Sequence, residues 1–186
     1  MGTRGLTKVI KNGETVVAQY GQWDHYPSGQ GVTAFYAVQR PDVIERLSAK
    51  VDTLCYYPSQ EEREEMWKPY MGGASQEGWV TFEEGKSFGD KYPSMTRDTG
   101  AEILYVIADS EERVPLFLDI DFEQDDLFCE GVYTVNLDNQ TFTSKWDEEV
   151  TLTFDEVREM SVKDYLANFM DEASAEESAK QVLAHH

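Results

Sequence analysis

The chain has 186 residues, 40% of them hydrophobic, and it carries a formal net charge of −20 at pH 7. A chain of this length can bury roughly 70% of its unfolded surface, so we expect a domain that needs neither a metal nor a disulfide to fold. The two cysteines, Cys55 and Cys129, lie far apart and predict reduced thiols. No apolar run approaches the roughly 18 residues of a membrane span and no signal peptide opens the chain, which favours a cytoplasmic protein.

The N-terminal third predicts a hairpin and then a helix. In "LTKVIKNGETVVAQY", residues 6–20, apolar residues flank Asn12-Gly13, the dipeptide that a two-residue type I′ turn requires. Residues 40–54 predict a helix, because Pro41 suits its first turn and the apolar residues recur at helical spacing. This apolar stripe consists of Ile44, Leu47, Val51 and Leu54.

A second, shorter helix is predicted by its capping box. Ser59 and Glu62 have the spacing at which each side chain bonds the other residue's backbone N–H. We expect this helix to end by Gly72-Gly73. Residues 72–100 are rich in Gly, Ser and Pro and predict loops with short strands.

The pattern of apolar residues changes after Ala101. Residues 102–109 ("EILYVIAD") and 114–121 ("VPLFLDID") are two apolar runs separated by a charged turn. Residues 131–146 alternate on both sides of Asp138-Asn139, which predicts another hairpin.

A helical region is predicted to follow, capped by Thr153 and Glu156. Its apolar face consists of Val162, Tyr165, Leu166, Phe169 and Met170. We expect residues 1–171 to form one α+β domain, an antiparallel sheet of five to seven strands with helices packed against it. Residues 172–186, with histidines at the end, predict a polar helix end or a frayed tail.

The negative charge is concentrated in the C-terminal half. Residues 1–98 carry 11 basic and 14 acidic side chains, whereas residues 99–186 carry 5 basic and 22 acidic ones. Such a field repels nucleic acid and anionic membranes and attracts basic protein surfaces. We therefore expect a basic protein partner, and neither direct nucleic-acid binding nor membrane binding.

The block "YGQWDHYPSGQG", residues 20–31, combines aromatic residues with Pro27 and three glycines. A loop this rigid loses little entropy on binding, so it could form a pocket for a small ligand, a nucleotide or a partner. The alternative is a self-packed loop that covers the end of the hairpin. The glycine spacing matches no phosphate-binding motif. The candidate site residues are Arg4, Trp23, Asp24, His25, Tyr26, Ser28 and Gln30.

The segment "LDIDFEQDD", residues 118–126, gathers carboxylates. If it is a strand, Asp119, Asp121 and Glu123 project from one face. The order of ligands in an EF-hand is absent, so a solvated acidic edge is favoured over a metal site. A third interpretation is that the carboxylates are spaced like phosphates and act as a decoy for a basic cleft. The candidate partner-binding residues are Asp119, Asp121, Glu123, Asp125, Asp126 and Glu130.

The remaining motifs give weak support for catalysis. Asp98-Thr99-Gly100 has no apolar strand before it and no second copy, so it predicts a turn into a strand rather than an aspartic protease. His25 is the one internal histidine through which a nucleophilic triad would have to run. An N-terminal nucleophile would require a second cleavage to expose Thr3, because Gly2 has no side chain. We predict no catalytic residue, no cofactor and no metal.

Three segments, "MGTRGL", "VAQYGQWDHYPSGQG" and "LFCEGVYTVNLDNQTF", resemble an uncharacterised family of small proteins encoded mainly by bacteriophages and prophages. The match covers both ends of the fold. One departure is Gly131, where the family pattern has a tryptophan. The resemblance implies a phage setting, a common fold and residence in the host cytoplasm, but it supplies no activity.

Charge and setting together lead to a functional hypothesis. Defence nucleases, including RNA-guided ones, hold nucleic acid in strongly positive channels. We expect an acidic anti-defence protein, such as an anti-CRISPR inhibitor, whose acidic C-terminal half occupies such a channel. The alternatives are an enzyme or nucleotide-binding module around residues 20–31, built on a scaffold that looks like an N-terminal nucleophile hydrolase, and an accessory protein whose loop holds a dimer together.

Overall fold

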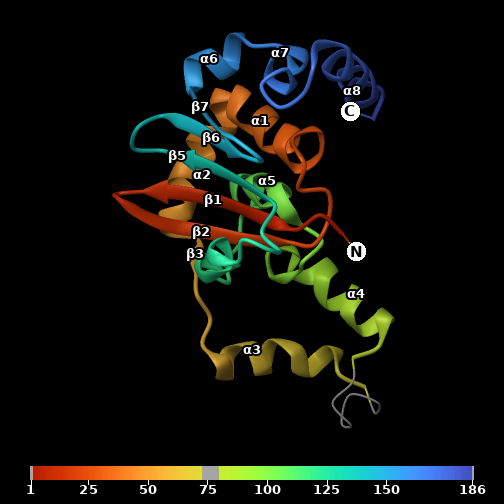
Figure 1. Ribbon diagram of the computed structural model, residues 1–186. Coiled ribbons are helices and arrows are strands. Elements are labelled where there is room, and N and C mark those ends of the chain that lie inside the picture. The colour runs from red at the N-terminus through yellow and green to blue at the C-terminus, as the bar shows by residue number, and fades with distance from the viewer. Residues whose placement is uncertain (1, 73–79, 186) are drawn as a thin grey trace.

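The computed structural model describes residues 2–72 and 80–185, and it contains a five-stranded sheet with the strand order β2-β1-β5-β6-β7 (Figure 1). The strands of this sheet are β1 (Gly5–Lys11), β2 (Glu14–Gly21), β5 (Gly131–Asn136), β6 (Thr141–Lys145) and β7 (Glu149–Thr153). A second, small sheet pairs β3 (Cys55–Tyr56) with β4 (Val114–Pro115). The α+β class and the expectation of at least five strands are confirmed.

The helices of the described ranges lie between strands in sequence or, toward the C-terminus, follow β7. They are α1 (Val32–Gln39), α2 (Pro41–Thr53), α3 (Gln60–Trp67), α4 (Phe82–Lys91), α5 (Ile103–Asp109), α6 (Phe154–Glu159), α7 (Val162–Leu166) and α8 (Glu172–His185). Shorter turns are the π-helical η1 (Pro27–Gly31) and the 3₁₀ turns η2 (Lys68–Tyr70), η4 (Pro93–Met95), η5 (Gly100–Glu102) and η6 (Ile120–Gln124). None of these helices is long and apolar enough to cross a membrane.

The main sheet is mixed rather than purely antiparallel. β1 pairs antiparallel with β2 but parallel with β5, from Gly5 opposite Gly131 to Ile10 opposite Asn136. Turn residues determine how neighbouring strands pair, whereas nothing local specifies that the N-terminal hairpin lies beside β5. The expectation of an antiparallel sheet is therefore corrected at this one pair.

The helices bury one face of the sheet. Val9, Val17 and Val135 project from β1, β2 and β5 into the same core as Phe35 of α1 and Leu104 of α5, and all five side chains are fully buried. Because successive side chains of a strand point to opposite faces, Lys8 lies on the other face, where it is only partly buried. That face is mixed, because Leu6 and Ala18 are buried on it as well.

Local signals for turns and helix caps are confirmed. Asn12 and Gly13 both have positive φ, 55° and 74°, as a type I′ turn requires. The helix predicted from residue 40 is α2, with Pro41 in its first turn. Complete capping boxes begin α3 at Ser59 and α6 at Thr153.

Two helices replace elements expected from the sequence. The run 102–109 forms α5, because a continuous apolar run suits a buried helix as well as a strand. The run 114–121 contributes the two-residue strand β4. Within residues 72–100, expected to be loops with short strands, Thr81 and Glu84 cap α4. The part of this expectation on residues 73–79 lies outside the described residues. The expected end of the second helix before Gly72 is confirmed, because α3 ends at Trp67.

The C-terminal segment is a packed helix rather than a frayed tail. Ala175, Ala179 and Val182 of α8 are buried and recur at helical spacing. Small side chains make this apolar stripe difficult to recognise in the sequence. Residue 186 lies outside the described residues.

The packing of α7 against the sheet can be tested at a pair of buried hydroxyl groups. Tyr165 Oη and Ser144 Oγ lie 2.9 Å apart, and both side chains are buried. Tyr165→Phe should lower the free energy of unfolding by about 1–3 kcal/mol because it leaves a buried partner unsatisfied. In urea unfolding, the double variant with Ser144→Ala should cost clearly less than the sum of the single changes. Simple additivity would contradict the pairing.

Candidate functional site

The acidic segment covers one edge of the sheet. Leu118 forms a parallel bridge with Ala18 of β2, and the Asp119 N–H donates to the Ala18 carbonyl at 3.0 Å. Beyond Asp119 the chain turns into η6, where Phe122 packs edge-on against Tyr20 with ring centroids 4.9 Å apart. The predicted strand with three carboxylates on one face is therefore wrong, because this segment has 3₁₀ rather than extended backbone.

Several of the predicted partner-binding carboxylates stabilise their own loop. Glu123 forms an ion pair with Lys8 at 2.6 Å, and Glu130 accepts a hydrogen bond from the backbone N–H of Arg4 at 3.0 Å. Asp125 accepts hydrogen bonds from two backbone N–H groups just after it in its own loop. Burial raises the pKa of Asp119. Glu123, Asp125 and Glu130 thus have structural roles and Asp119 is half-buried, whereas Asp121 and Asp126 are exposed.

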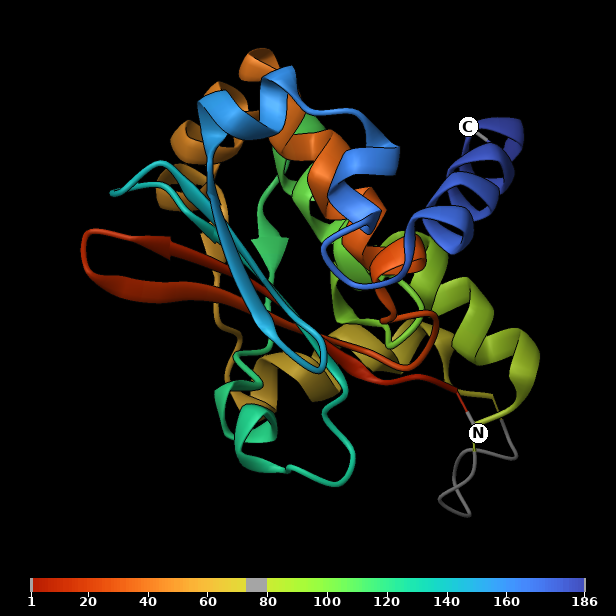
Figure 2. The same ribbon diagram turned by 45° about the horizontal axis from the view of Figure 1, so that its top comes forward.

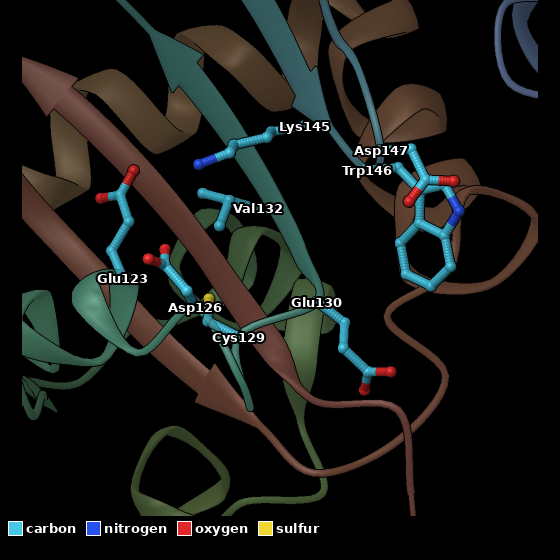
Figure 3. A pocket seen from close by; sticks show the side chains of 8 residues that line it. All are labelled: Glu123, Asp126, Cys129, Glu130, Val132, Lys145, Trp146 and Asp147. Atoms are coloured by element: carbon cyan, nitrogen blue, oxygen red, sulfur yellow. The ribbon is translucent and has the colours of Figure 1, made fainter.

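A pocket of about 340 Å³ brings part of this segment against the turn between β6 and β7 (Figure 3). Its lining residues are Glu123, Asp126, Cys129, Glu130, Val132, Lys145, Trp146 and Asp147. The arrangement joins three predicted carboxylates to Asp147 and Trp146, which the sequence analysis did not single out. The antiparallel pairing of β5 with β6 produces this meeting, because it places Val132 opposite Lys145 and so brings Gly131 and the β6–β7 turn to the same end of the sheet.

The chemistry of this pocket suits a cation. Four carboxylates and one ammonium group, that of Lys145, line it. A guanidinium or ammonium group of a partner would meet an excess of negative charge here, and an indole ring such as that of Trp146 adds a cation–π surface. Burial raises the pKa of the Cys129 thiol to about 11, so this side chain stays a protonated thiol at neutral pH.

The block at residues 20–31 is organised around three glycines in one row of the sheet. Gly21, Gly5 and Gly131 lie side by side on β2, β1 and β5. A Cβ on Gly21 would lie 2.1 Å from His25 Cε1, and one on Gly5 would lie 2.6 Å from His25 Cδ2. A Cβ on Gly131 would lie 2.0 Å from the His25 carbonyl oxygen, so no tryptophan could replace Gly131 in this structure. Gly21 and Gly5 thus leave room for the imidazole ring, and Gly131 leaves room for the backbone of His25.

His25 is a core residue rather than a catalytic base. Its side chain is fully buried, and Nδ1 lies 3.1 Å from the Trp23 carbonyl, which fixes Nδ1 as the protonated nitrogen. The Tyr133 hydroxyl donates to the His25 carbonyl at 2.7 Å. Nε2 has no hydrogen-bond partner in the described part of the chain. Burial lowers the pKa of His25 to about 4, so the ring is neutral at physiological pH.

The polar side chains of the block form hydrogen bonds within the protein, both inside the block and to the segment 98–101. The Trp23 indole N–H donates to Asp98 at 2.8 Å, and the Tyr26 hydroxyl donates to Asp24 at 3.1 Å. The Gln30 amide accepts from the Ala101 N–H at 2.8 Å. This arrangement favours the self-packed alternative over a ligand site.

The remaining candidate residues lie apart from a common centre. Ser28 is half-buried in η1, and the Arg4 guanidinium lies 4.3 Å from the centroid of the Phe128 ring. The Thr3 carbonyl accepts the His25 N–H at 3.2 Å. Asp98-Thr99-Gly100 forms a turn, but it leads into η5 and α5 rather than a strand. Among the described residues, no group of three or more His, Cys, Asp or Glu side chains could hold a metal ion.

Substituting the glycine row tests its role. Gly21→Ala should lower the free energy of unfolding by about 2 kcal/mol or more, because the new methyl group overlaps the buried imidazole. Gly85→Ala in α4 is the matched control, since the nearest atom is 4.0 Å from the added Cβ, and should be neutral or stabilise by about 0.5–1 kcal/mol. Equal effects of the two changes in urea unfolding would contradict the close packing.

The depressed pKa of His25 predicts a specific pH dependence. The unfolded chain takes up a proton at this residue below pH 6.5, whereas the folded protein does so only near pH 4. Stability is therefore fully present above pH 6.5 and falls as the pH drops toward 4, by about 3 kcal/mol from this group. His25→Asn, which keeps a donor for the Trp23 carbonyl, should lose less stability over this range. Parallel curves for the two proteins would contradict a neutral buried imidazole.

Comparison of the chain with known protein families, with curated proteins and with solved structures gives no match. The resemblance to a family of phage proteins therefore stays a prediction from the sequence.

Proposed function

We propose that this chain is an acidic anti-defence protein that binds the positively charged nucleic-acid channel of a host nuclease and excludes the nucleic acid. RNA-guided nucleases are the class that the phage resemblance favours. The observation that carries the proposal is the pocket lined by Glu123, Asp126, Glu130 and Asp147, in which Trp146 lies beside Asp147 (Figure 3). Channels that bind phosphates present arginine and lysine side chains, which are the groups that this pocket would accept.

The exposed carboxylates around the pocket extend its negative surface. Asp126 lines it, Asp121 belongs to η6 two residues before the lining residue Glu123, and Asp147 and Glu148 lie on the β6–β7 turn. All four are exposed, so they keep their charge available to a partner. Rows of carboxylates at such positions could replace the phosphates that a channel normally binds.

The acidic C-terminal half does not form a single binding face. β5 pairs with β1 of the N-terminal half, and Gln39 of α1 donates to the carbonyls of Val157 and Met160 next to α6. The charges of α6–α8 therefore lie among the helices, away from η6 (Figure 1). In the proposal, the pocket makes the contact and the helices add a long-range field that speeds association.

A charge-reversal experiment tests this function. Asp121, Asp126 and Asp147, each changed to lysine, should raise the concentration needed to inhibit DNA cleavage by a purified RNA-guided nuclease by about tenfold or more. The matched control changes Glu61, Glu64 and Glu65 of α3 to lysine, which alters net charge equally but away from the pocket. This control should shift inhibition by less than about threefold.

The outcome is decisive in either direction. Equal losses in the two triple variants would mean that net charge alone acts, and would contradict a binding face at the pocket. Failure of the unchanged protein to bind any of a panel of purified nucleases would contradict the proposed function itself.

A further inference from the structure

The two edges of the main sheet differ in how they are covered. The outer edge of β2 is occupied by Leu118 and Asp119, which bond to Ala18. β7 is the last strand at the opposite edge, and no strand of the described residues pairs with its outer side (Figure 2). Unpaired edges are templates for another strand, so natural proteins usually protect them.

The hydrogen-bond pattern of β6 and β7 identifies the backbone groups that face outward. The Phe154 N–H donates to the Gln140 carbonyl at 2.9 Å, and the Trp146 N–H donates to the Glu148 carbonyl at 3.1 Å. Since bonded pairs alternate along an antiparallel ladder, every second residue of β7 points its N–H and C=O toward β6. The intervening residues, Glu149, Thr151 and Thr153, point these groups away from the sheet.

One of the outward groups is already satisfied, and the others are not. The Thr153 N–H donates to the Glu156 side chain at 3.3 Å as part of the cap of α6. The backbone groups of Glu149 and Thr151 form no bond outside the sheet within the described ranges. Both residues are exposed. The strand "EVTLT" has no proline, lysine or bulge of the kind that protects an edge.

We propose that β7 binds an extended segment of a basic protein partner as a sixth strand of the sheet. Backbone hydrogen bonds to Glu149 and Thr151 would provide the pairing. Carboxylates at both ends of the strand would select the charge of the segment. Asp147 and Glu148 precede β7, and Asp155 follows it. The proposal goes beyond the proposed function, because it concerns the backbone of the β7 edge, which shares only Asp147 and Glu148 with the surface of the pocket, and it requires no nuclease.

A second copy of this chain is a poor occupant of the same edge. Two β7 strands paired antiparallel around Thr151 would place Glu149 opposite Thr153 and Asp147 opposite Asp155 of the other copy. Carboxylates directly across a ladder repel each other, and two chains of charge −20 repel at long range as well. For a segment rich in lysine or arginine, the interaction across the ladder and the long-range interaction with the net charge are both attractive.

A charge-matched pair of peptides tests the pairing. The probe is a capped peptide of about ten alternating lysine and threonine residues, and its control carries N-methyl groups on every second residue. The two peptides have the same charge, but the control lacks the N–H donors along one edge and therefore cannot pair with β7 through that edge. We expect the control to bind at least about tenfold more weakly and only the unmethylated peptide to protect the Thr151 amide from hydrogen exchange. Equal affinities would overturn the proposal.

Variants of Thr151 complete the experiment. Thr151→Pro removes the outward N–H without removing a bond to β6, and should weaken binding of the probe at least about tenfold. Thr151→Val keeps the N–H and should bind within about threefold of the unchanged protein. Should the proline variant unfold, the methylated peptide still decides the question. A dimer of the unchanged protein in light scattering that the probe does not dissociate would overturn the proposal.

The peptide experiment and the nuclease experiment can fail independently of each other. Reversal of Asp121, Asp126 and Asp147 should weaken both peptides but leave the ratio of their affinities unchanged. Loss of nuclease inhibition with this ratio intact would contradict the proposed function alone, whereas loss of the ratio would contradict strand addition alone.

Discussion

The close approach of His25 to three adjacent glycines is the constraint on which the rest of the fold depends. Gly21, Gly5 and Gly131 belong to β2, β1 and β5, so this one contact joins the N-terminal hairpin to the C-terminal strands. The Tyr133 hydroxyl then fixes the backbone of His25 from β5. The arrangement costs the desolvation of an imidazole, which shows in its low pKa, and it leaves no room for a side chain on any of the three glycines.

The proposed binding surface depends on this contact. β5 runs parallel to β1 from Gly131 onward, so the acidic loop that precedes it ends beside Arg4. β6 returns antiparallel and brings Trp146 to the same end of the sheet. The pocket therefore forms from two segments that are separated in sequence. The pairing of β5 with β6 places Val132 opposite Lys145, and the ion pair of Glu123 with Lys8 ties η6 to β1.

Sequence reasoning predicted those features that a few neighbouring residues determine. Asn12-Gly13 specifies a turn and Thr153 begins a helix through chemistry confined to four residues. The pairing of β1 with β5 has no such local signal, and the apolar run in α5 fits two structures until its packing is known. At the candidate site, six carboxylates were identified from composition, but their roles depend on partners such as Lys8 that only the fold brings near. Trp146 carries no signal in the sequence beyond its aromatic character.

The concentration of charge and the open edge are connected by a physical argument. A sheet edge without lysine, proline or a bulge invites pairing with any exposed strand, including that of another copy. In the proposed strand addition, carboxylates on either side of β7 would repel copies of the chain and other acidic strands, because like charges would face each other across the new ladder. Lysine protects other sheet edges by the same kind of charge repulsion, whereas carboxylates would repel acidic strands and attract basic ones. The net charge of −20 would then both oppose self-pairing at this edge and favour cationic partners.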